Sequence, residues 1–139
     1  MRTDKPILLV EDDQIDAMTV KRALNEIKIK NPIVTAQNGE EALEYLNDEG
    51  NEVPCLILLD LNMPKMNGIE FLNVIKHSDK HKQRMIPVIV LTTSKDDQDK
   101  IETFKLSVAG YMVKPVDYLQ FVETMKAIEL YWSLSEMPQ

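Results

Sequence analysis

Short runs of apolar residues recur along the chain and are separated by longer stretches of mixed apolar and polar residues. The runs cover residues 7–10, 33–36, 55–59, 88–91 and 111–113. Their length is typical of β-strands. The third and fourth runs contain no alternating polar residues, which indicates strands buried on both faces, as in a parallel sheet.

The stretches between these runs carry apolar residues at spacings of three and four, which place one apolar stripe on an α-helix. The stripes are Ala17, Val20, Leu24 and Ile27; Ala42, Leu43 and Leu46; Ile69, Leu72 and Ile75; Ile101, Phe104 and Val108; and Phe121, Met125, Ile128 and Trp132. The last two helices are expected to begin at Ser94 and Asp117, each followed three residues later by an acid or an amide. Residues 77–86, rich in basic side chains, are expected to form a solvated loop.

Strand and helix patterns alternate in the order (βα)5. This order predicts an α/β fold with a doubly wound, five-stranded parallel sheet. No internal repeat, low-complexity tract or linker divides the sequence, so residues 1–139 are expected to form one domain. In such folds ligands bind outside the carboxyl ends of the strands, and the residues that follow each strand therefore indicate function.

Polar residues suited to phosphate chemistry follow four of the five predicted strands. They are Glu11, Asp12 and Asp13 after the first, Asp60 and Asn62 after the third, Thr92, Thr93 and Ser94 after the fourth, and Lys114, which is followed by Pro115, after the fifth. Clustered carboxylates repel one another unless a cation lies among them. The sheet edge is therefore expected to bind a hard divalent ion, and Mg²⁺ suits oxygen ligands.

Asp60 is the candidate nucleophile of this edge. A carboxylate is already ionised at neutral pH and can attack a phosphorus atom without a general base. Lys114 can neutralise one phosphoryl oxygen, and the Thr92 hydroxyl can donate a hydrogen bond to another. The pattern predicts Mg²⁺-dependent phosphoryl transfer to Asp60.

These motifs resemble the receiver domain of two-component response regulators, of the chemotaxis-regulator type with a flavodoxin-like fold, over about residues 6–130. The matching segments are residues 10–13, 60–68, 91–94 and 110–115. The resemblance implies a signalling switch rather than an enzyme, phosphorylated by a sensor histidine kinase. It implies a metal site formed by Glu11, Asp12, Asp60 and the backbone carbonyl of Asn62, whereas Asp13 is expected to be solvated or to cap a helix.

The family's switch implies further roles for residues of this chain. Thr92 is expected to move toward the phosphoryl group, and Tyr111 to turn from an exposed to a buried rotamer. The peptide between Lys114 and Pro115 resembles the family's cis peptide. Asn62 and Ser94 occupy positions that tune hydrolysis of the acyl phosphate, and the β-branched Thr93 adds bulk at the mouth of the site.

The end of the sequence points to a subfamily. Residues 129–139 extend the last helix and no output domain follows, so output is expected to pass through an unknown partner protein. Residues 127–132 resemble the end of the small response regulators of bacterial phytochromes, which implies a light-sensing kinase and a homodimer built with the terminal helix. Tyr131 and Trp132 are candidate interface residues, and packing of Trp132 against the sheet remains an equal alternative.

The composition limits the cellular compartment in which the protein is expected and the kinds of partner that it can bind. A formal net charge of −7 argues against direct binding of nucleic acid. The single cysteine, Cys55, permits no intramolecular disulfide and favours a reducing compartment. Neither a secretory signal nor a membrane span is evident, so a cytoplasmic protein is expected.

Two other classes of protein fit parts of the pattern. Phosphatases of the haloacid dehalogenase type also form an aspartyl phosphate, but their Asp-x-Asp motif follows the first strand, where this chain has Glu11-Asp12-Asp13. A phosphorylation-independent binding module of receiver fold is the other alternative. The presence of Asp12, Asp60, Thr92 and Lys114 together argues against it.

Overall fold

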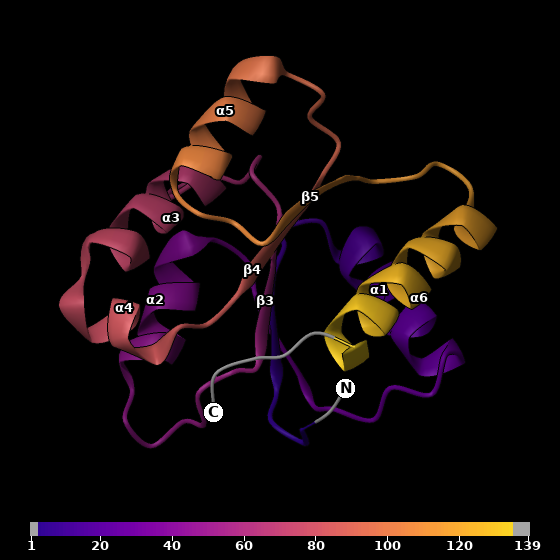
Figure 1. The fold of residues 1–139 in the computed structure, drawn as a ribbon, viewed down its shortest axis with the longest axis horizontal. Helices are drawn as coiled ribbons and strands as arrows, with labels where there is room; N and C mark the ends of the chain where they lie inside the picture. The colour runs from indigo at the N-terminus through magenta and orange to yellow at the C-terminus, as the bar shows by residue number, and fades with distance from the viewer. Residues whose placement is uncertain (1–2, 135–139) are drawn as a thin grey trace.

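Strands and helices alternate along almost the whole chain (Figure 1). The computed structural model describes residues 3–134, without the side chains of residues 82–84, 133 and 134. The elements are β1 (Ile7–Val10), α1 (Gln14–Glu26), β2 (Ile33–Ala36), α2 (Gly39–Asn47), β3 (Leu56–Leu59), α3 (Gly68–His77), α4 (Asp79–Arg84), β4 (Val88–Thr92), α5 (Asp97–Lys105), β5 (Gly110–Val113) and α6 (Tyr118–Leu134). The five predicted strands are confirmed, with bounds that shift by one residue at most.

The strands form one parallel sheet in the order β2-β1-β3-β4-β5. Val10 at the end of β1 is paired with Leu59 at the end of β3, so the two strands finish at the same level. Thr92 at the end of β4 is paired in the same way with Val113 of β5. Since all strands run in one direction, the residues that follow them are collected at one edge, as the doubly wound fold requires.

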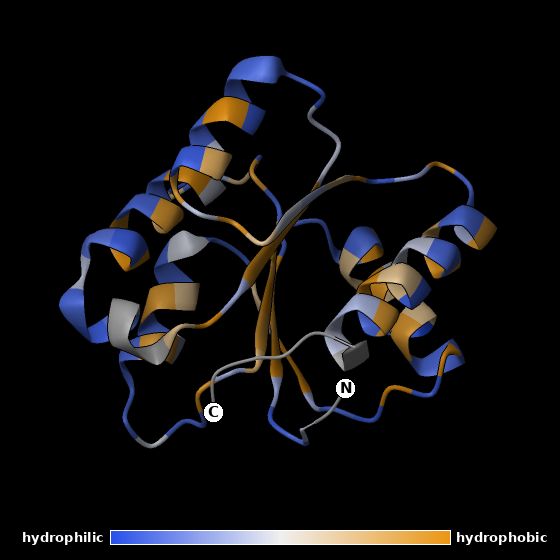
Figure 2. Cartoon of the chain, in the orientation of Figure 1, coloured by the Kyte–Doolittle hydropathy of each residue, from blue (hydrophilic) through white to orange (hydrophobic). Residues whose placement is uncertain are grey.

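Helices cover both faces of the sheet. Figure 1 shows α1 and α6 on one side and α2, α3, α4 and α5 on the other. Each side has its own apolar core, and the hydrophobic residues lie on the strands and on the inward faces of the helices (Figure 2). All residues of β1, β3 and β4 are buried, which confirms the expectation of strands covered on both faces.

Residues 77–86 differ from the expectation of a solvated loop. Residues 79–84 form the short helix α4, which packs against α3. His81 is consequently 8% exposed and belongs to the interior of this region. None of the helices in the described part of the chain is both long and apolar enough to cross a membrane.

The orientation of α5 also differs from the prediction. Ile101 and Phe104 were expected to face the core, but they are 49% and 56% exposed, whereas Thr103 is fully buried. The Thr103 hydroxyl donates to the carbonyl of Asp99 at 2.9 Å, so its polar atom is satisfied inside the helix and the residue can face the sheet. The helix is capped by Asp96, which accepts from the amide of Gln98, and not by Ser94.

The apolar stripe of α6 packs as its spacing predicts. Phe121, Met125, Ile128 and Trp132 are all buried in the core on the α1 side of the sheet. Trp132 is 4% exposed, so it is a core residue and not an exposed contact. Tyr131 lies beside it with 54% of its surface exposed. Of the two candidate interface residues, only Tyr131 is available to a partner.

Replacing Trp132 by Ala is therefore expected to lower the free energy of unfolding by about 3–5 kcal/mol, because a large buried side chain leaves a cavity. The matched change Tyr131→Ala is expected to cost less than about 1 kcal/mol, since an exposed side chain is lost. Urea denaturation of both variants measures the difference. Equal losses of stability in the two variants would contradict the burial of Trp132.

Candidate functional site

Three carboxylates meet where β1 and β3 end. Glu11 and Asp12 follow β1, Asp60 follows β3, and one oxygen from each lies within 4.8 Å of the others. Glu11 is 3% exposed and Asp60 is 6% exposed, whereas Asp12 is exposed to solvent. The structure thus brings these three sequence-predicted residues together at one edge of the sheet.

Backbone hydrogen bonds fix the chain at these positions. The amide of Glu11 donates to the carbonyl of Ala36 at 2.8 Å, and the amide of Asp60 donates to the carbonyl of Val10 at 3.0 Å. Asp13 then caps α1 by accepting from the amides of Ile15 and Asp16. Its role as a capping acid is as expected, and the cap turns the chain away from the sheet directly after the acidic pair.

The loop from Asp60 to α3 is held close to the site by a tight backbone contact. A Cβ atom on Gly68 would lie 2.5 Å from the carbonyl oxygen of Asp60 and 2.8 Å from the Cα of Leu61. The Gly68 amide donates to the carbonyl of Leu61 at 3.0 Å, which closes the loop. Only glycine fits this approach without displacing the backbone that carries Asp60.

Asn62 and Thr93 lie on exposed parts of the loops around the site. The backbone N–H of Asn62 donates to Asp60 Oδ1, with 3.4 Å between the two atoms. Thr93 follows the last residue of β4. Their suggested influence on access and on hydrolysis stays a prediction.

The Lys114 ammonium is the cation of the site. It contacts a Glu11 oxygen directly and lies 2.8 Å from Asp16 Oδ2 and 3.4 Å from Asp60 Oδ2. The Lys114 side chain is 6% exposed. Burial by itself would lower the pKa of Lys114, but the hydrogen bonds to Asp16 and Glu11 and the nearby charge of Asp60 outweigh it and raise the pKa above its ordinary value.

The peptide between Lys114 and Pro115 is trans and so differs from the cis peptide that it resembles in sequence, and the described residues contain no cis peptide. The amide of Lys114 donates to the carbonyl of Thr92 at 2.7 Å. This bond extends the β4–β5 pairing to Lys114 and directs its side chain toward the carboxylates with the trans peptide in place.

Asp16 is a part of the site that the sequence did not reveal. It lies in the first turn of α1, five residues beyond Glu11, and its carboxylate reaches Lys114 from the helix side. Acidic residues in a first helical turn are common because they favour the positive end of the helix dipole. The one feature of the sequence that could have indicated its role is its position one helical turn after the N-cap residue Asp13.

Glu11 is the most deeply buried carboxylate of the group. Burial raises the pKa of Glu11 from its ordinary value of 4.5 to about 7, and this effect exceeds the opposing hydrogen bond from Lys114. The repulsion from Asp60 acts in the same direction as burial. An all-oxygen set of carboxylates within 4.8 Å of one another fits a hard divalent cation such as Mg²⁺, which would relieve this repulsion.

A chain of hydrogen bonds leads from the site to β5 through Ser94. Thr92, fully buried at the end of β4, accepts at Oγ1 from the Ser94 amide at 3.3 Å. The hydroxyl of Tyr111 donates to the Ser94 carbonyl at 3.0 Å, and the Ser94 hydroxyl lies 2.6 Å from Asp99 of α5. Tyr111 is half-buried in this arrangement, and burial raises the pKa of its phenol.

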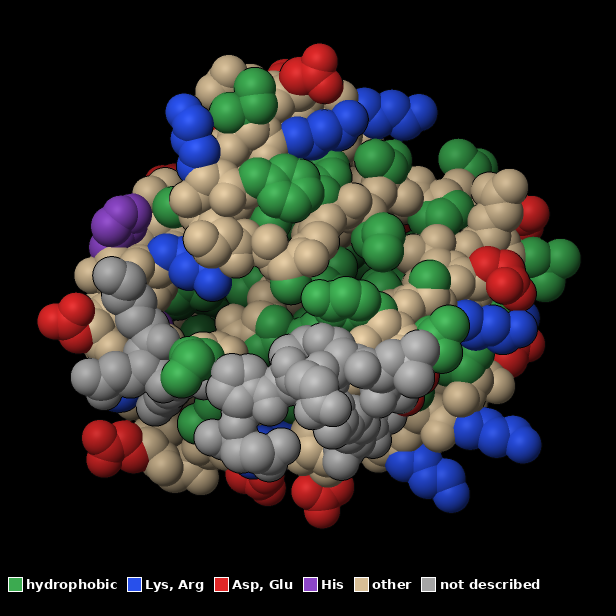
Figure 3. All heavy atoms as spheres, in the orientation of Figure 1, with side chains coloured by type: hydrophobic (Ala, Val, Ile, Leu, Met, Phe, Trp, Pro, Cys, Tyr) green, Lys and Arg blue, Asp and Glu red, His purple; other side chains and the backbone are tan. Residues whose placement is uncertain are grey.

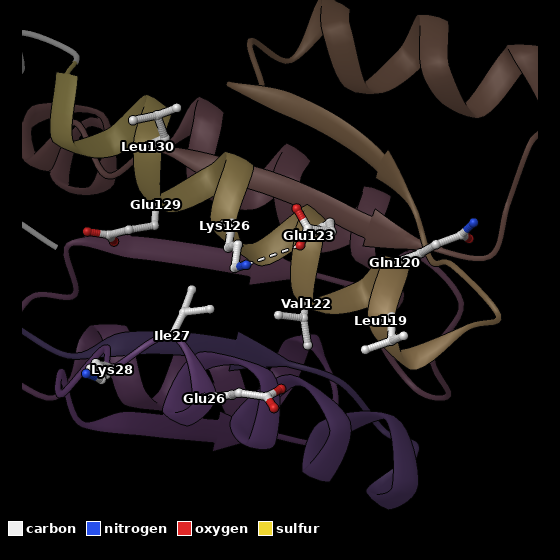
Figure 4. A pocket seen from close by; sticks show the side chains of 10 residues that line it. All are labelled: Glu26, Ile27, Lys28, Leu119, Gln120, Val122, Glu123, Lys126, Glu129 and Leu130. Atoms are coloured by element: carbon white, nitrogen blue, oxygen red, sulfur yellow. Dashed lines mark hydrogen bonds and ion pairs between the residues drawn. The ribbon is translucent and has the colours of Figure 1, made fainter.

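A groove lies between the end of α1 and α6, but its side chains do not form a comparable cluster of carboxylates and lysine. Figure 4 shows Ile27 and Val122 across this groove, with mixed acidic and basic side chains around them. Its lining contains Lys126 paired with Glu123 at 3.2 Å. The acidic cluster at the strand ends is the one potential metal site among the described residues, and it lies elsewhere.

Comparison with known proteins agrees with the geometry of the strand ends. The family model described as the response regulator receiver domain matches residues 7–126. The response regulator Rcp1 of Synechocystis is 36% identical over 92% of this chain and 88% of its own length. A probable methanogenesis regulatory protein of Methanothrix harundinacea, FilR2, is 38% identical over 91% of this chain and 82% of its own length.

Solved structures show the same likeness. The Mn²⁺-bound form of Rcp1 has a TM-score of 0.86 with 35% identity, and the alignment covers 97% of this chain and 99% of Rcp1. The phosphorylated cyanobacterial phytochrome response regulator RcpA has a TM-score of 0.87 with 36% identity, over 99% of this chain and 100% of that one. The six helices and the parallel five-stranded sheet are those of a flavodoxin-like receiver.

The buried Glu11 carboxyl makes stability depend on pH. Its pKa is higher in the folded protein than the ordinary value that it regains on unfolding, so between about pH 4.5 and 7 the folded state binds more protons. The metal-free protein should therefore lose stability as the pH rises through this range, by up to on the order of 3 kcal/mol.

Denaturant titrations in EDTA from pH 5 to pH 8 measure this loss. Glu11→Gln should flatten the pH dependence, because the neutral amide cannot ionise. An unchanged slope in Glu11→Gln would assign the pH dependence to other groups.

Proposed function

The chain belongs to the response regulator receiver family, and we propose from this premise that it is a stand-alone receiver that accepts a phosphoryl group on Asp60 from a sensor histidine kinase. The observation that carries the proposal is the meeting of Asp60 with Lys114, Glu11 and Asp12 at one strand edge. The alignment with Rcp1 and RcpA over nearly their full lengths supports the same receiver role for this chain.

The proposed reaction forms a bond between a carboxylate oxygen of Asp60 and the phosphorus of a phosphohistidine, while the phosphorus–nitrogen bond of the donor breaks. Asp60 can act as the nucleophile because its carboxylate needs no base. Lys114 lies 3.4 Å from Asp60 Oδ2 and can bind an oxygen of the incoming group. Thr92 is the candidate donor to another oxygen, from the end of the neighbouring strand.

Mg²⁺ is the proposed cofactor, held by Glu11, Asp12, Asp60 and the Asn62 carbonyl. When bound, it would offset the negative charge that develops on the phosphoryl oxygens. Rcp1 has been described in an Mn²⁺-bound form, which supports binding of a divalent cation by this chain as well. Asp12 is exposed and can exchange water for metal with little rearrangement, while Glu11 supplies charge from the buried side.

The signal is proposed to travel through Ser94. Thr92 and Tyr111 both bond to the backbone of this residue, Thr92 to its amide and Tyr111 to its carbonyl. A shift of Thr92 toward a phosphoryl group would remove one of these bonds and change the loop that Tyr111 holds. The proposed switch therefore has a physical route from Asp60 to β5 and α5.

The kinase is proposed to dock beside the acidic cluster of Glu11, Asp12 and Asp60. Ile15 and Met18 on the outer face of α1 are 74% and 67% exposed, although both are large and apolar. Val116, in the loop between Lys114 and α6, is fully exposed, and Leu119, in the first turn of α6, is 70% exposed. Exposed apolar residues that flank a reactive site favour contact with another protein. The likeness to RcpA supports a phytochrome-type kinase as the donor.

Output is proposed to use the exposed apolar residues of α5 and of the C-terminal half of α6. Hydrophobic side chains gather between α5 and α6 on the face shown in Figure 3. Ile101 and Phe104 of α5 and Leu130 and Tyr131 of α6 are exposed apolar residues that could contact a downstream protein or a second copy in a homodimer. We place the protein in the cytoplasm as a switch rather than an enzyme; its net charge of −7 opposes direct contact with nucleic acid.

The assignment of Asp60 is tested with Asp60→Asn. The wild type should gain one phosphoryl group from acetyl phosphate in the presence of Mg²⁺, whereas Asp60→Asn should gain none, because the amide is not a nucleophile. Intact-protein mass spectrometry measures the added mass. Asp79→Asn, an exposed change on α4, is the matched control and should react as the wild type does.

Other outcomes distinguish the alternatives. A wild type that gains no phosphate from acetyl phosphate or from a kinase would be a phosphorylation-independent binding module. Continuous release of phosphate from small esters would indicate a phosphatase. Phosphate incorporation in Asp60→Asn at wild-type stoichiometry would sink the assignment of Asp60.

The docking surface is tested with Met18→Glu. With a phytochrome-type histidine kinase that phosphorylates the wild type, transfer to Met18→Glu should slow by about tenfold or more, because a charge enters an apolar contact. Phosphorylation by acetyl phosphate should be unchanged. Met85→Glu replaces a methionine of similar exposure, 66%, outside the strand-end edge. Equal slowing in both variants would contradict docking at α1.

A further inference from the structure

The three hydrogen atoms of the Lys114 ammonium already have three carboxylate acceptors. Glu11 contacts the nitrogen directly, Asp16 lies at 2.8 Å, and Asp60 is the most distant at 3.4 Å. An ammonium group has three donors and no more. Lys114 can therefore bind a phosphoryl oxygen only if one of these contacts weakens.

Asp16 is the carboxylate that can give way most readily. Its side chain is 37% exposed, against 2% for Glu11 and 8% for Asp60, so water can replace Lys114 around it. It comes from α1, whereas Glu11 and Asp60 directly follow strands. It is also absent from the group of carboxylates placed to share a metal ion.

We propose that Asp16 is a positioning residue that holds the Lys114 ammonium in the unphosphorylated protein and competes for it with the phosphoryl group on Asp60. The proposal rests on the proposed phosphoryl acceptance by Asp60. Asp16 then opposes phosphorylation in two ways. It occupies a donor of Lys114, and its negative charge lies next to the path of an anionic phosphoryl group.

Neutralising Asp16 should favour the phosphorylated state. The Asn amide of Asp16→Asn still offers an oxygen to Lys114, but the hydrogen bond loses one of its two charges and roughly half its strength. Phosphorylation by acetyl phosphate should become faster by about threefold to tenfold, on the same reasoning about charge-assisted bonds. Hydrolysis of the phosphorylated protein should slow, since Lys114 stays with the phosphoryl group.

Asp13→Asn is a closely matched control. It removes the same charge from the same end of α1, but Asp13 accepts from the backbone amides of Ile15 and Asp16 and not from Lys114. Asn is as good an N-cap as Asp, so the helix should be unaffected. If the loss of one negative charge were sufficient, both variants would be phosphorylated faster to the same extent. If Asp16 competes for Lys114, only Asp16→Asn should be phosphorylated faster.

The contact itself is tested by nuclear magnetic resonance, without phosphate or metal. The ammonium protons of Lys114, assigned by their loss in Lys114→Ala, should exchange slowly with water in the wild type and in Asp13→Asn. They should exchange several times faster in Asp16→Asn, because one acceptor is weakened. Equal exchange in all three proteins would overturn the proposal.

Rates with acetyl phosphate and Mg²⁺ provide the second test. Faster phosphorylation in Asp16→Asn than in Asp13→Asn supports the competition, and equal rates in the two variants overturn it even if the ammonium exchange differs. If the wild type accepts no phosphate, the proposed function fails. The exchange measurement then still decides whether Asp16 holds Lys114.

Discussion

Lys114 places its ammonium group among Glu11, Asp16 and Asp60 with 6% of its side chain exposed, and this ion cluster constrains the surrounding structure. A buried carboxylate such as Glu11 is strongly unfavourable unless a cation is near it. The lysine in turn needs acceptors for all three protons. Each strand that ends at the cluster must therefore hold its position closely, and the hydrogen bonds at Val10, Ala36 and Thr92 supply that precision.

The ion cluster also explains why the strand ends are held rigidly and still carry an excess of negative charge. Three carboxylates, those of Glu11, Asp16 and Asp60, contact one ammonium, and Asp12 adds a fourth carboxylate beside Glu11 and Asp60, so the edge remains anionic. A divalent cation and a phosphoryl group bring opposite charges to it and are complementary to each other. The fold thus holds an arrangement whose charge is balanced best when both are bound, as expected of a receiver.

Residues at strand ends could be predicted from the sequence because parallel strands deliver them to one edge whatever the details of packing. Asp16 could not, since its place depends on where Asp13 starts α1 and how that helix is rotated. The buried face of α5 was predicted wrongly because apolar spacing ignores a threonine that satisfies its own hydroxyl. The sequence was equally compatible with Trp132 in the core and with Trp132 at an interface. The packing of α6 against the sheet shows that it lies in the core.

Because α5 exposes Ile101 and Phe104 and buries Thr103, it should be held to the sheet less firmly than α3. Within this helix Thr103 is the buried residue, whereas α3 buries Phe71, Leu72 and Ile75 against the sheet. Little apolar area is lost if α5 shifts or frays, so its local opening free energy should lie well below that of the whole domain. A coupling of about 1–3 kcal/mol, typical of allosteric proteins, would then be enough to redistribute its conformations.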